Sequence, residues 1–155
     1  MSKTEAVQKY WEAFCETNPG VERQAPYQTW YFGMGREDAA ELAALVLEGK
    51  KRATASMPAE YENDPEDMPA LGGYSVVTDF DGEPLCIVRT TEVRIVPFNE
   101  VDAEFAFDEG EGDQSLDYWR QVHWDYFTRR LTQLGKQPSE TMPVICERFE
   151  LLYKT

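Results

Sequence analysis

Apolar residues recur at helical spacing in three segments of the chain, residues 2–17, 37–48 and 115–134. In each segment they stand three or four positions apart, which is the pattern of a helix with one buried face. In the last segment the predicted buried face starts with Leu116, Trp119, Val122 and Tyr126. Each segment is followed by a glycine, a common helix stop: Gly20, Gly49 and Gly135.

A different pattern follows residue 73, where β-branched and aromatic residues dominate. Residues 74–80 and 85–95 form two such runs, separated by a short stretch that contains Asp81-Gly82. This dipeptide is typical of a tight hairpin turn, because both central residues need positive φ. We therefore expect a β-hairpin here and a further strand at residues 143–153.

The remaining segments lack clear periodicity. Residues 58–69 are rich in acidic residues and proline and are predicted to be a loop, residues 98–107 a short helix or turn, and residues 109–113 an acidic, glycine-rich loop. Helices on both sides of a run of antiparallel strands indicate an α+β fold whose sheet curls into a small barrel. We expect residues 1–155 to form a single domain, and we find no internal repeat.

Composition supports a folded intracellular protein. Apolar residues make up 42% of the 155 residues and aromatic residues 13%, enough to build a core. The first residues lack the apolar stretch of a secretory signal, and no run approaches the ~20 apolar residues of a membrane span. We expect a cytoplasmic protein without membrane contact. Its three cysteines are far apart and are predicted to be reduced core residues: Cys15, Cys86 and Cys146.

The net charge of −14 limits the partners of the chain. Nonspecific affinity for nucleic acid comes mainly from Lys and Arg side chains that displace counterions from phosphates, so tight binding of duplex DNA is not expected. Screening limits the reach of this charge to about 8 Å at physiological salt. A local pocket could therefore still accept one nucleotide or a short single strand.

Residues 49–54 form the first candidate for chemistry, with cations and a hydroxyl just after a helix end. In an ideal strand Lys51 and Thr54 would point to opposite faces, so the chain must bend if both are to meet one ligand. Gly49 permits such a bend. The alternative is a solvated turn whose cations favour the negative end of the preceding helix.

The acidic segment is the second candidate. Glu109, Glu111 and Asp113 alternate with glycines, so their side chains could bind a metal, orient a lysine or simply favour the start of the next helix. The spacing departs from a calcium loop, and the only histidine, His123, is isolated and more typical of a structural position. We therefore expect neither a metal nor another cofactor.

Read together, these motifs resemble the ASCH domain family, in its larger single-domain bacterial type. The resemblance rests on residues 30–33, the Gly49-x-Lys51-x-x-Thr54 motif, the strand pair and the segment from Ala106 to Leu116, and it spans nearly the whole chain. It implies a PUA-like β-barrel and a role in RNA binding or RNA-linked chemistry. The family motif usually continues threonine-x-arginine, but Ser56 stands at the arginine position here.

Some members of the family are amidohydrolases that remove the acyl group from N4-acetylcytidine. Their lysine, threonine and glutamate are similar to Lys51, Thr54 and Glu109, which the resemblance makes the candidate catalytic residues. Thr54 would attack the amide carbonyl after Lys51 takes its proton, provided that the pKa of Lys51 is lowered. Lys50 and Arg52 nearby would lower that pKa, whereas Glu109 would raise it.

Other relatives of similar length are associated with ribonuclease activity on single-stranded RNA, and a noncatalytic RNA-binding module is a third hypothesis. For a ribonuclease, Lys51 with Tyr74 and Ser115 would be the polar candidates, although Ser115 has the alternative role of a helix cap. A modified nucleoside or a short single-stranded RNA is thus the expected partner. The predicted substrate-binding residues are Arg52, Ser56, Tyr74, Glu111 and Ser115.

Overall fold

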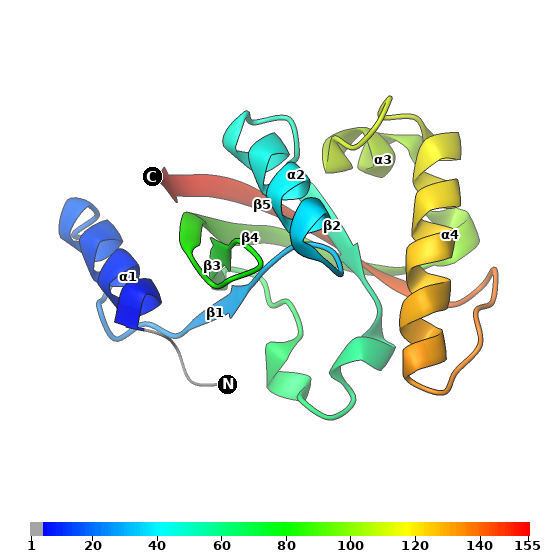
Figure 1. Ribbon diagram of the computed structural model, residues 1–155, viewed down its shortest axis with the longest axis horizontal. Helices are drawn as coiled ribbons and strands as arrows, with labels where there is room; N and C mark the ends of the chain where they lie inside the picture. Colours follow the sequence, from blue (N-terminus) through cyan, green and yellow to red (C-terminus); the bar gives the residue numbers. More distant parts are fainter. Residues whose placement is uncertain (1–4) are drawn as a thin grey trace.

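The structure is a computed structural model that describes residues 5–155 of the chain (Figure 1). Of the predicted first helix, residues 2–4 lie outside the described part. The helices are α1 (Glu5–Thr17), α2 (Arg36–Leu47), α3 (Ala103–Glu109) and α4 (Leu116–Gln133), and the strands are β1 (Tyr27–Trp30), β2 (Ala53–Ser56), β3 (Tyr74–Thr78), β4 (Pro84–Pro97) and β5 (Pro143–Lys154). The short 3-10 helices are η1 (Pro58–Tyr61), η2 (Pro65–Asp67) and η3 (Phe98–Glu100).

The five strands form one mixed sheet in the order β1-β3-β4-β5-β2. Only β1 and β3 run parallel, and the other neighbours are antiparallel, so the α+β class is confirmed. The predicted closure into a barrel is wrong for residues 5–155, because β1 and β2 remain at opposite edges of the sheet. These edge strands have four residues each, too short to meet across the sheet formed by the much longer β4 and β5.

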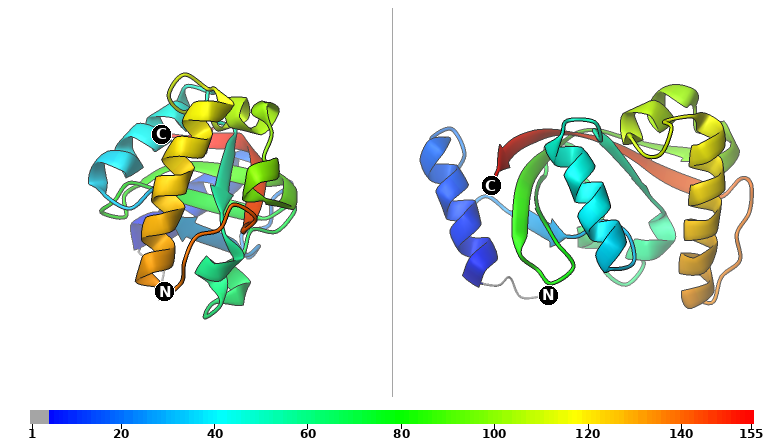
Figure 2. Two further views of the ribbon diagram at one scale, coloured as in Figure 1. Left: turned by 90° about the vertical axis from the view of Figure 1, so that its right-hand side faces the viewer. Right: turned by 45° about the horizontal axis from the view of Figure 1, so that its top comes forward.

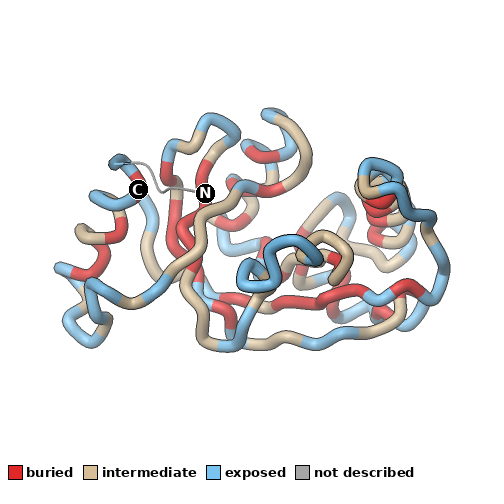
Figure 3. Tube along the Cα trace, turned by 90° about the horizontal axis from the view of Figure 1, so that it is seen from below, coloured by how far each residue is buried: buried red, intermediate tan, exposed pale blue. Residues whose placement is uncertain are grey.

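Helices cover the sheet at three places along the long central strands. Figure 2 shows α1 and α4 at opposite ends of the molecule, with α2 between them. The core is divided accordingly: Trp11 of α1, Val46 of α2 and Trp119 of α4 each belong to a different cluster of buried apolar residues. Buried segments run along the central strands, whereas the connecting loops are exposed (Figure 3). None of the helices in residues 5–155 is both long and apolar enough to cross a membrane.

The predicted hairpin is confirmed, but its turn is longer than expected. β3 ends at Thr78, and the Asp79 carboxylate accepts hydrogen bonds from the backbone N–H groups of Asp81 and Glu83, each at 2.9 Å. Of the two residues Asp81 and Gly82, only Gly82 has positive φ, at 91°, so the predicted two-residue turn is wrong. The Asp79 side chain stabilises the wider loop, which explains the difference.

The predicted loop at residues 58–69 contains helical turns, and the short helix or turn predicted at residues 98–107 is confirmed. Residues 58–69 include η1 and η2, because a proline opens each turn and the Glu60 carboxylate accepts a bond from the Met57 N–H at 2.9 Å. Residues 98–107 include η3 and most of α3, which Asp102 caps by accepting from the Phe105 N–H. α3 extends to Glu109, so this residue ends a helix and does not lie in the loop.

The three cysteines are confirmed as buried residues with free thiols. Burial raises the pKa of the Cys86 and Cys146 thiols to about 12, which makes both groups poor nucleophiles at neutral pH.

Candidate functional site

Lys51 lies in the short segment that joins α2 to β2. Gly49 has φ of 80° and ends the helix, and the backbone N–H groups of Lys50 and Lys51 then both donate to the Leu45 carbonyl at 3.0 Å. β2 begins only at Ala53, so Lys51 stands outside the strand, as the expected bend requires. Its side chain turns inward, and the residue is only 2% exposed.

The buried ammonium of Lys51 faces three oxygens. Its Nζ lies 2.7 Å from Glu111 Oε2, 3.4 Å from Glu109 Oε2 and 3.3 Å from the Glu109 backbone carbonyl. The Phe32 ring lies below it, 5.3 Å from Nζ to the ring centroid. An ammonium has three N–H donors, so these three oxygens can use all of them.

Both carboxylates reach Lys51 because Gly110 lets two segments pass closely. Gly110 ends α3 with φ of 73°, and a Cβ built on it would lie 2.5 Å from the Lys50 carbonyl oxygen. No other residue fits without displacing backbone. Glu109 on one side of this glycine is fully buried, at 1% exposure, while the Glu111 side chain on the other side keeps 15%.

His123 completes the cluster, although its isolated place in the sequence indicated a structural position. Its Nε2 lies 3.1 Å from Glu109 Oε2, its Nδ1 lies 2.9 Å from the Trp119 carbonyl, and its ring stacks on the Trp119 indole at 4.2 Å. Both neighbouring atoms are acceptors, so both ring nitrogens donate when the imidazole carries its second proton. Glu109 therefore lies between two cations, Lys51 and His123.

A signal for His123 was present in the sequence. The buried positions of α4 are Trp119, His123, Phe127 and Leu131, spaced every four residues. On the predicted buried face, Val122 and Tyr126 are only half-buried, and Tyr126 packs against the core cluster around Trp119. A single histidine in register with three buried apolar residues indicates an inward-facing imidazole.

Burial and the neighbouring charges shift the pKa values of this cluster away from their ordinary values. Burial opposes charge on Lys51, yet the two carboxylates outweigh it and raise its pKa. Burial alone would raise the pKa of Glu109, but the charges of Lys51 and His123 outweigh burial and lower that pKa strongly. Burial alone would lower the pKa of His123, but the charge of Glu109 outweighs burial and raises that pKa. Burial and the neighbouring Glu109 raise the pKa of Glu111 to about 7 despite Lys51. Glu111 thus titrates near neutral pH.

These contacts bear on metal binding. One ligand atom each from Glu109, Glu111 and His123 lies within 4.8 Å of the others, which is compact enough to surround an ion. The Lys51 ammonium already supplies positive charge to both carboxylates at this place. A metal would therefore have to displace Lys51 from buried acidic partners.

Thr54 and Ser56 lie on β2 and face β5. In the antiparallel ladder Thr54 is directly opposite Glu147, so both side chains project from the same face of the sheet. Among residues 5–155 the Thr54 hydroxyl has no hydrogen-bond partner, and Ser56 bonds the Tyr61 hydroxyl. Burial raises the pKa of Tyr61 to about 12, so this phenol stays protonated.

Lys51 lies over the same face as Thr54. Glu147 and Phe149 are two residues apart on β5 and share a face. The ring centroids of Phe149 and Phe32 lie 6.5 Å apart, and the Lys51 ammonium lies over the Phe32 ring. The structure therefore brings Lys51 and Thr54 to one side of the sheet.

Three other predicted residues are held elsewhere. The Arg52 guanidinium pairs with Asp108 at 2.8 Å, and the Ser115 hydroxyl caps α4 by accepting from the Tyr118 N–H. The Tyr74 ring packs against Trp11 of α1 at 5.4 Å. Their predicted contacts with a substrate stay predictions.

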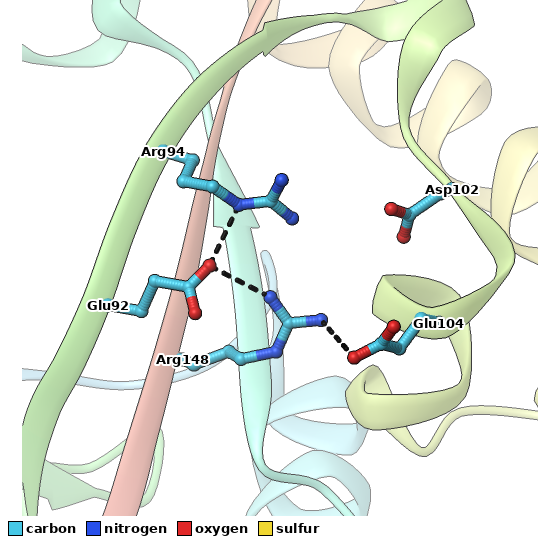
Figure 4. A pocket seen from close by; sticks show the side chains of 5 residues that line it. All are labelled: Glu92, Arg94, Asp102, Glu104 and Arg148. Carbon is cyan, nitrogen blue, oxygen red and sulfur yellow. Dashed lines mark hydrogen bonds and ion pairs between the residues drawn. The ribbon is translucent and has the colours of Figure 1, made fainter.

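A separate polar pocket lies on the other face of β5, where Arg148 follows Glu147 (Figure 4). Its two arginines are paired internally: Glu92 bonds Arg94 at 2.8 Å and Arg148 at 3.2 Å. Arg148 also binds Asp108 at 3.0 Å. This ion-pair network leaves little free charge for a ligand. The lining of the pocket contains none of the predicted site residues, although Asp108 also pairs with Arg52.

Comparison with known proteins identifies the relatives of this fold. The ASCH domain family model matches residues 28–153. An ASCH domain from Lactobacillus crispatus is 34% identical, with a TM-score of 0.87, covering 99% of this chain and 98% of that one. Protein EF3133 from Enterococcus faecalis is 32% identical, with a TM-score of 0.86, covering 97% and 90%.

A third structure, hypothetical protein PH0355, shares the fold alone. It is 16% identical with a TM-score of 0.52, covering 80% of this chain and 99% of that one. No curated protein matches the chain.

Proposed function

Because the chain belongs to the ASCH domain family, we propose that its buried lysine site serves a hydrolase that deacylates N4-acetylcytidine or a similar acylated nucleoside. The contact between Lys51 Nζ and Glu111 Oε2, at 2.7 Å, carries this proposal. It joins a buried lysine to a carboxyl group whose pKa is about 7, on the side of the sheet where Thr54 presents its hydroxyl.

The pair of Lys51 and Glu111 supplies a route for the proton of the nucleophile. Lys51 is charged in the resting protein, so it can act as a base only after its own proton moves to Glu111. A bound substrate that excludes water favours this transfer, because burial destabilises an ion pair relative to its neutral form. The pKa of Glu111 near neutrality makes it a suitable acceptor.

The reaction then follows acyl transfer. The Lys51 amine takes the proton of the Thr54 hydroxyl, whose oxygen attacks the amide carbonyl. The carbon–nitrogen bond breaks, and the departing cytosine nitrogen receives the proton from Lys51. Water then hydrolyses the acyl ester on Thr54, which releases a carboxylic acid and restores the hydroxyl.

Glu109 has a positioning role in this scheme. Its pKa is too low for it to carry a proton at neutral pH, and its Oε2 lies close to both Lys51 and His123. It fixes the lysine, while His123, stacked on Trp119, fixes Glu109. Proton transfer to the leaving group therefore falls to Lys51, with Glu111 as its proton-accepting partner.

Cleavage of RNA ranks second for a physical reason. A ribonuclease would use the Lys51 ammonium to stabilise phosphate charge, but that ammonium is already opposed by two carboxylates. The net charge of −14 also disfavours a long polyanion.

The test is an incubation of purified protein with N4-acetylcytidine and, separately, with a labelled single-stranded RNA, both without metal. Chromatography should show cytidine and intact RNA. Shortened RNA without cytidine would favour the ribonuclease, and neither product would leave a binding module as the function.

A further inference from the structure

Glu147 is a buried carboxyl group that the proposed reaction does not use. It lies in the middle of β5 and is 5% exposed. Its Oε2 accepts a hydrogen bond from the Thr90 hydroxyl of β4 at 2.6 Å. Within residues 5–155 this is the hydrogen bond that its side chain makes, so the other oxygen, Oε1, carries none.

A carboxyl group in this position is costly to the fold. Burial raises the pKa of Glu147, while Thr90 and the charge of Lys51 only partly oppose that effect. An apolar residue would be more stable here, as at the neighbouring Ile145 and Phe149 on the same face.

Three adjacent strands place Glu147 beside the proposed nucleophile. Thr54 of β2 is directly opposite Glu147, which is held from the other side by Thr90 of β4. Directly opposed residues on one face have Cβ atoms about 4.5–5.5 Å apart. The two side chains do not hydrogen-bond each other, so the Thr54 hydroxyl and Glu147 Oε1 both keep capacity to bind a ligand group on this face of the sheet.

From this arrangement we infer that Glu147, positioned by Thr90, is a substrate-binding residue whose Oε1 accepts the amide N–H of an acylated aminopyrimidine. The inference rests on the proposed function and adds its specificity. Carboxylates accept hydrogen bonds from the exocyclic nitrogen of cytosine. In a secondary amide the N–H is one bond from the carbonyl carbon, so one side chain can hold the nitrogen while Thr54 faces the carbon.

The chemical consequence is a preference for secondary amides. An N4-acyl cytosine that also carries a methyl group on the same nitrogen has no N–H to donate, so it would leave Glu147 Oε1 unpaired. Sites built to bind a polar hydrogen reject analogues that lack it. The protein should therefore bind N4-acetylcytidine in preference to its N4-methyl derivative.

Binding to a Thr54→Ala protein tests this inference apart from turnover. Calorimetry should give tighter binding of N4-acetylcytidine than of its N4-methyl derivative, by at least about tenfold. In Thr54→Ala/Glu147→Leu that preference should fall below about twofold, while Thr54→Ala/Glu150→Leu, which removes an exposed carboxylate of the same strand, should keep it. Glu147→Gln keeps an acceptor and should keep most of the preference.

The outcomes separate the two proposals. A preference that depends on Glu147 in a protein that releases no cytidine would support the binding role and reject the hydrolase. Cytidine release with equal binding of both compounds would overturn the role of Glu147 and leave the hydrolase intact. If Glu147→Leu does not fold, binding of the two ligands to the Glu147→Gln protein decides. A protein that binds neither of the two ligands overturns the inference.

Discussion

Lys51 and Glu111 are 60 residues apart in the chain, yet Nζ and Oε2 lie 2.7 Å from each other. The contact exists because Gly110 allows the end of α3 to pass against the Lys50 carbonyl, and because Lys51 has left α2 before β2 begins. It joins the Gly49-x-Lys51-x-x-Thr54 motif to the acidic, glycine-rich segment.

We expect activity to rise with pH through about 7 in the wild-type protein, because Glu111 must be ionised to accept a proton and burial raises its pKa to about 7. Glu111→Gln should remove this dependence and lower kcat by about 10²-fold or more. The measurement is the pH profile of kcat on N4-acetylcytidine. An unchanged profile in the variant would assign the titration to another group.

Lys51→Met should destabilise the protein by about 3–5 kcal/mol, because it leaves the buried Glu109 carboxylate with one cation fewer. Lys50→Met is the matched control, since Lys50 is exposed and should change stability by less than about 0.5 kcal/mol. Urea unfolding of both variants measures the difference. Equal stabilities would mean that the ammonium does not compensate Glu109.

His123 should keep its second proton to a higher pH than an ordinary imidazole, because Glu109 outweighs burial in raising its pKa. It is the only histidine, so ¹H–¹⁵N spectra of protein without an affinity tag report its ring directly. A raised pKa in the folded state contributes stability that is fully present below the ordinary value of 6.5 and is lost as pH rises through the folded value. The stability advantage of wild type over His123→Gln should therefore shrink as pH rises through the folded pKa of His123, and a ring that loses its second proton below pH 6.5 would contradict this account.

Gly110→Ala should cost more stability than Gly49→Ala. Both glycines have positive φ, which costs a residue with a Cβ about 1–2 kcal/mol. A Cβ at Gly49 meets nothing within 4 Å, whereas one at Gly110 would lie 2.5 Å from the Lys50 carbonyl oxygen. Thermal unfolding should separate the two variants by at least about 1 kcal/mol, and equal losses would show that the two segments do not pass so closely.

Much of the fold could be read from local patterns. Periodicity located α1, α2 and α4, and the strand-forming residues on both sides of Asp81-Gly82 located the hairpin. The turn itself was missed because the side chain of Asp79, outside the dipeptide, determines its shape. Closure of the sheet could not be read from the sequence either, since it depends on how far two short edge strands lie apart.

The site was predictable in part. The resemblance indicated Lys51, Thr54 and Glu109, and the structure places the first and last in contact. The charge state of Lys51 could not be predicted, because it depends on whether burial or the carboxylates dominate. Glu147 gave no local signal: its importance comes from lying opposite Thr54 in a strand ladder that joins distant parts of the chain.

The most direct test of the central claim is the rate of cytidine release from N4-acetylcytidine by wild type, Thr54→Ala and Thr54→Ser. The account predicts release by wild type, a loss of at least about 10³-fold in Thr54→Ala, and partial recovery in Thr54→Ser, which keeps a hydroxyl at the same place. Release by a folded Thr54→Ala protein at the wild-type rate would contradict the account, because the acyl group would then never pass through Thr54.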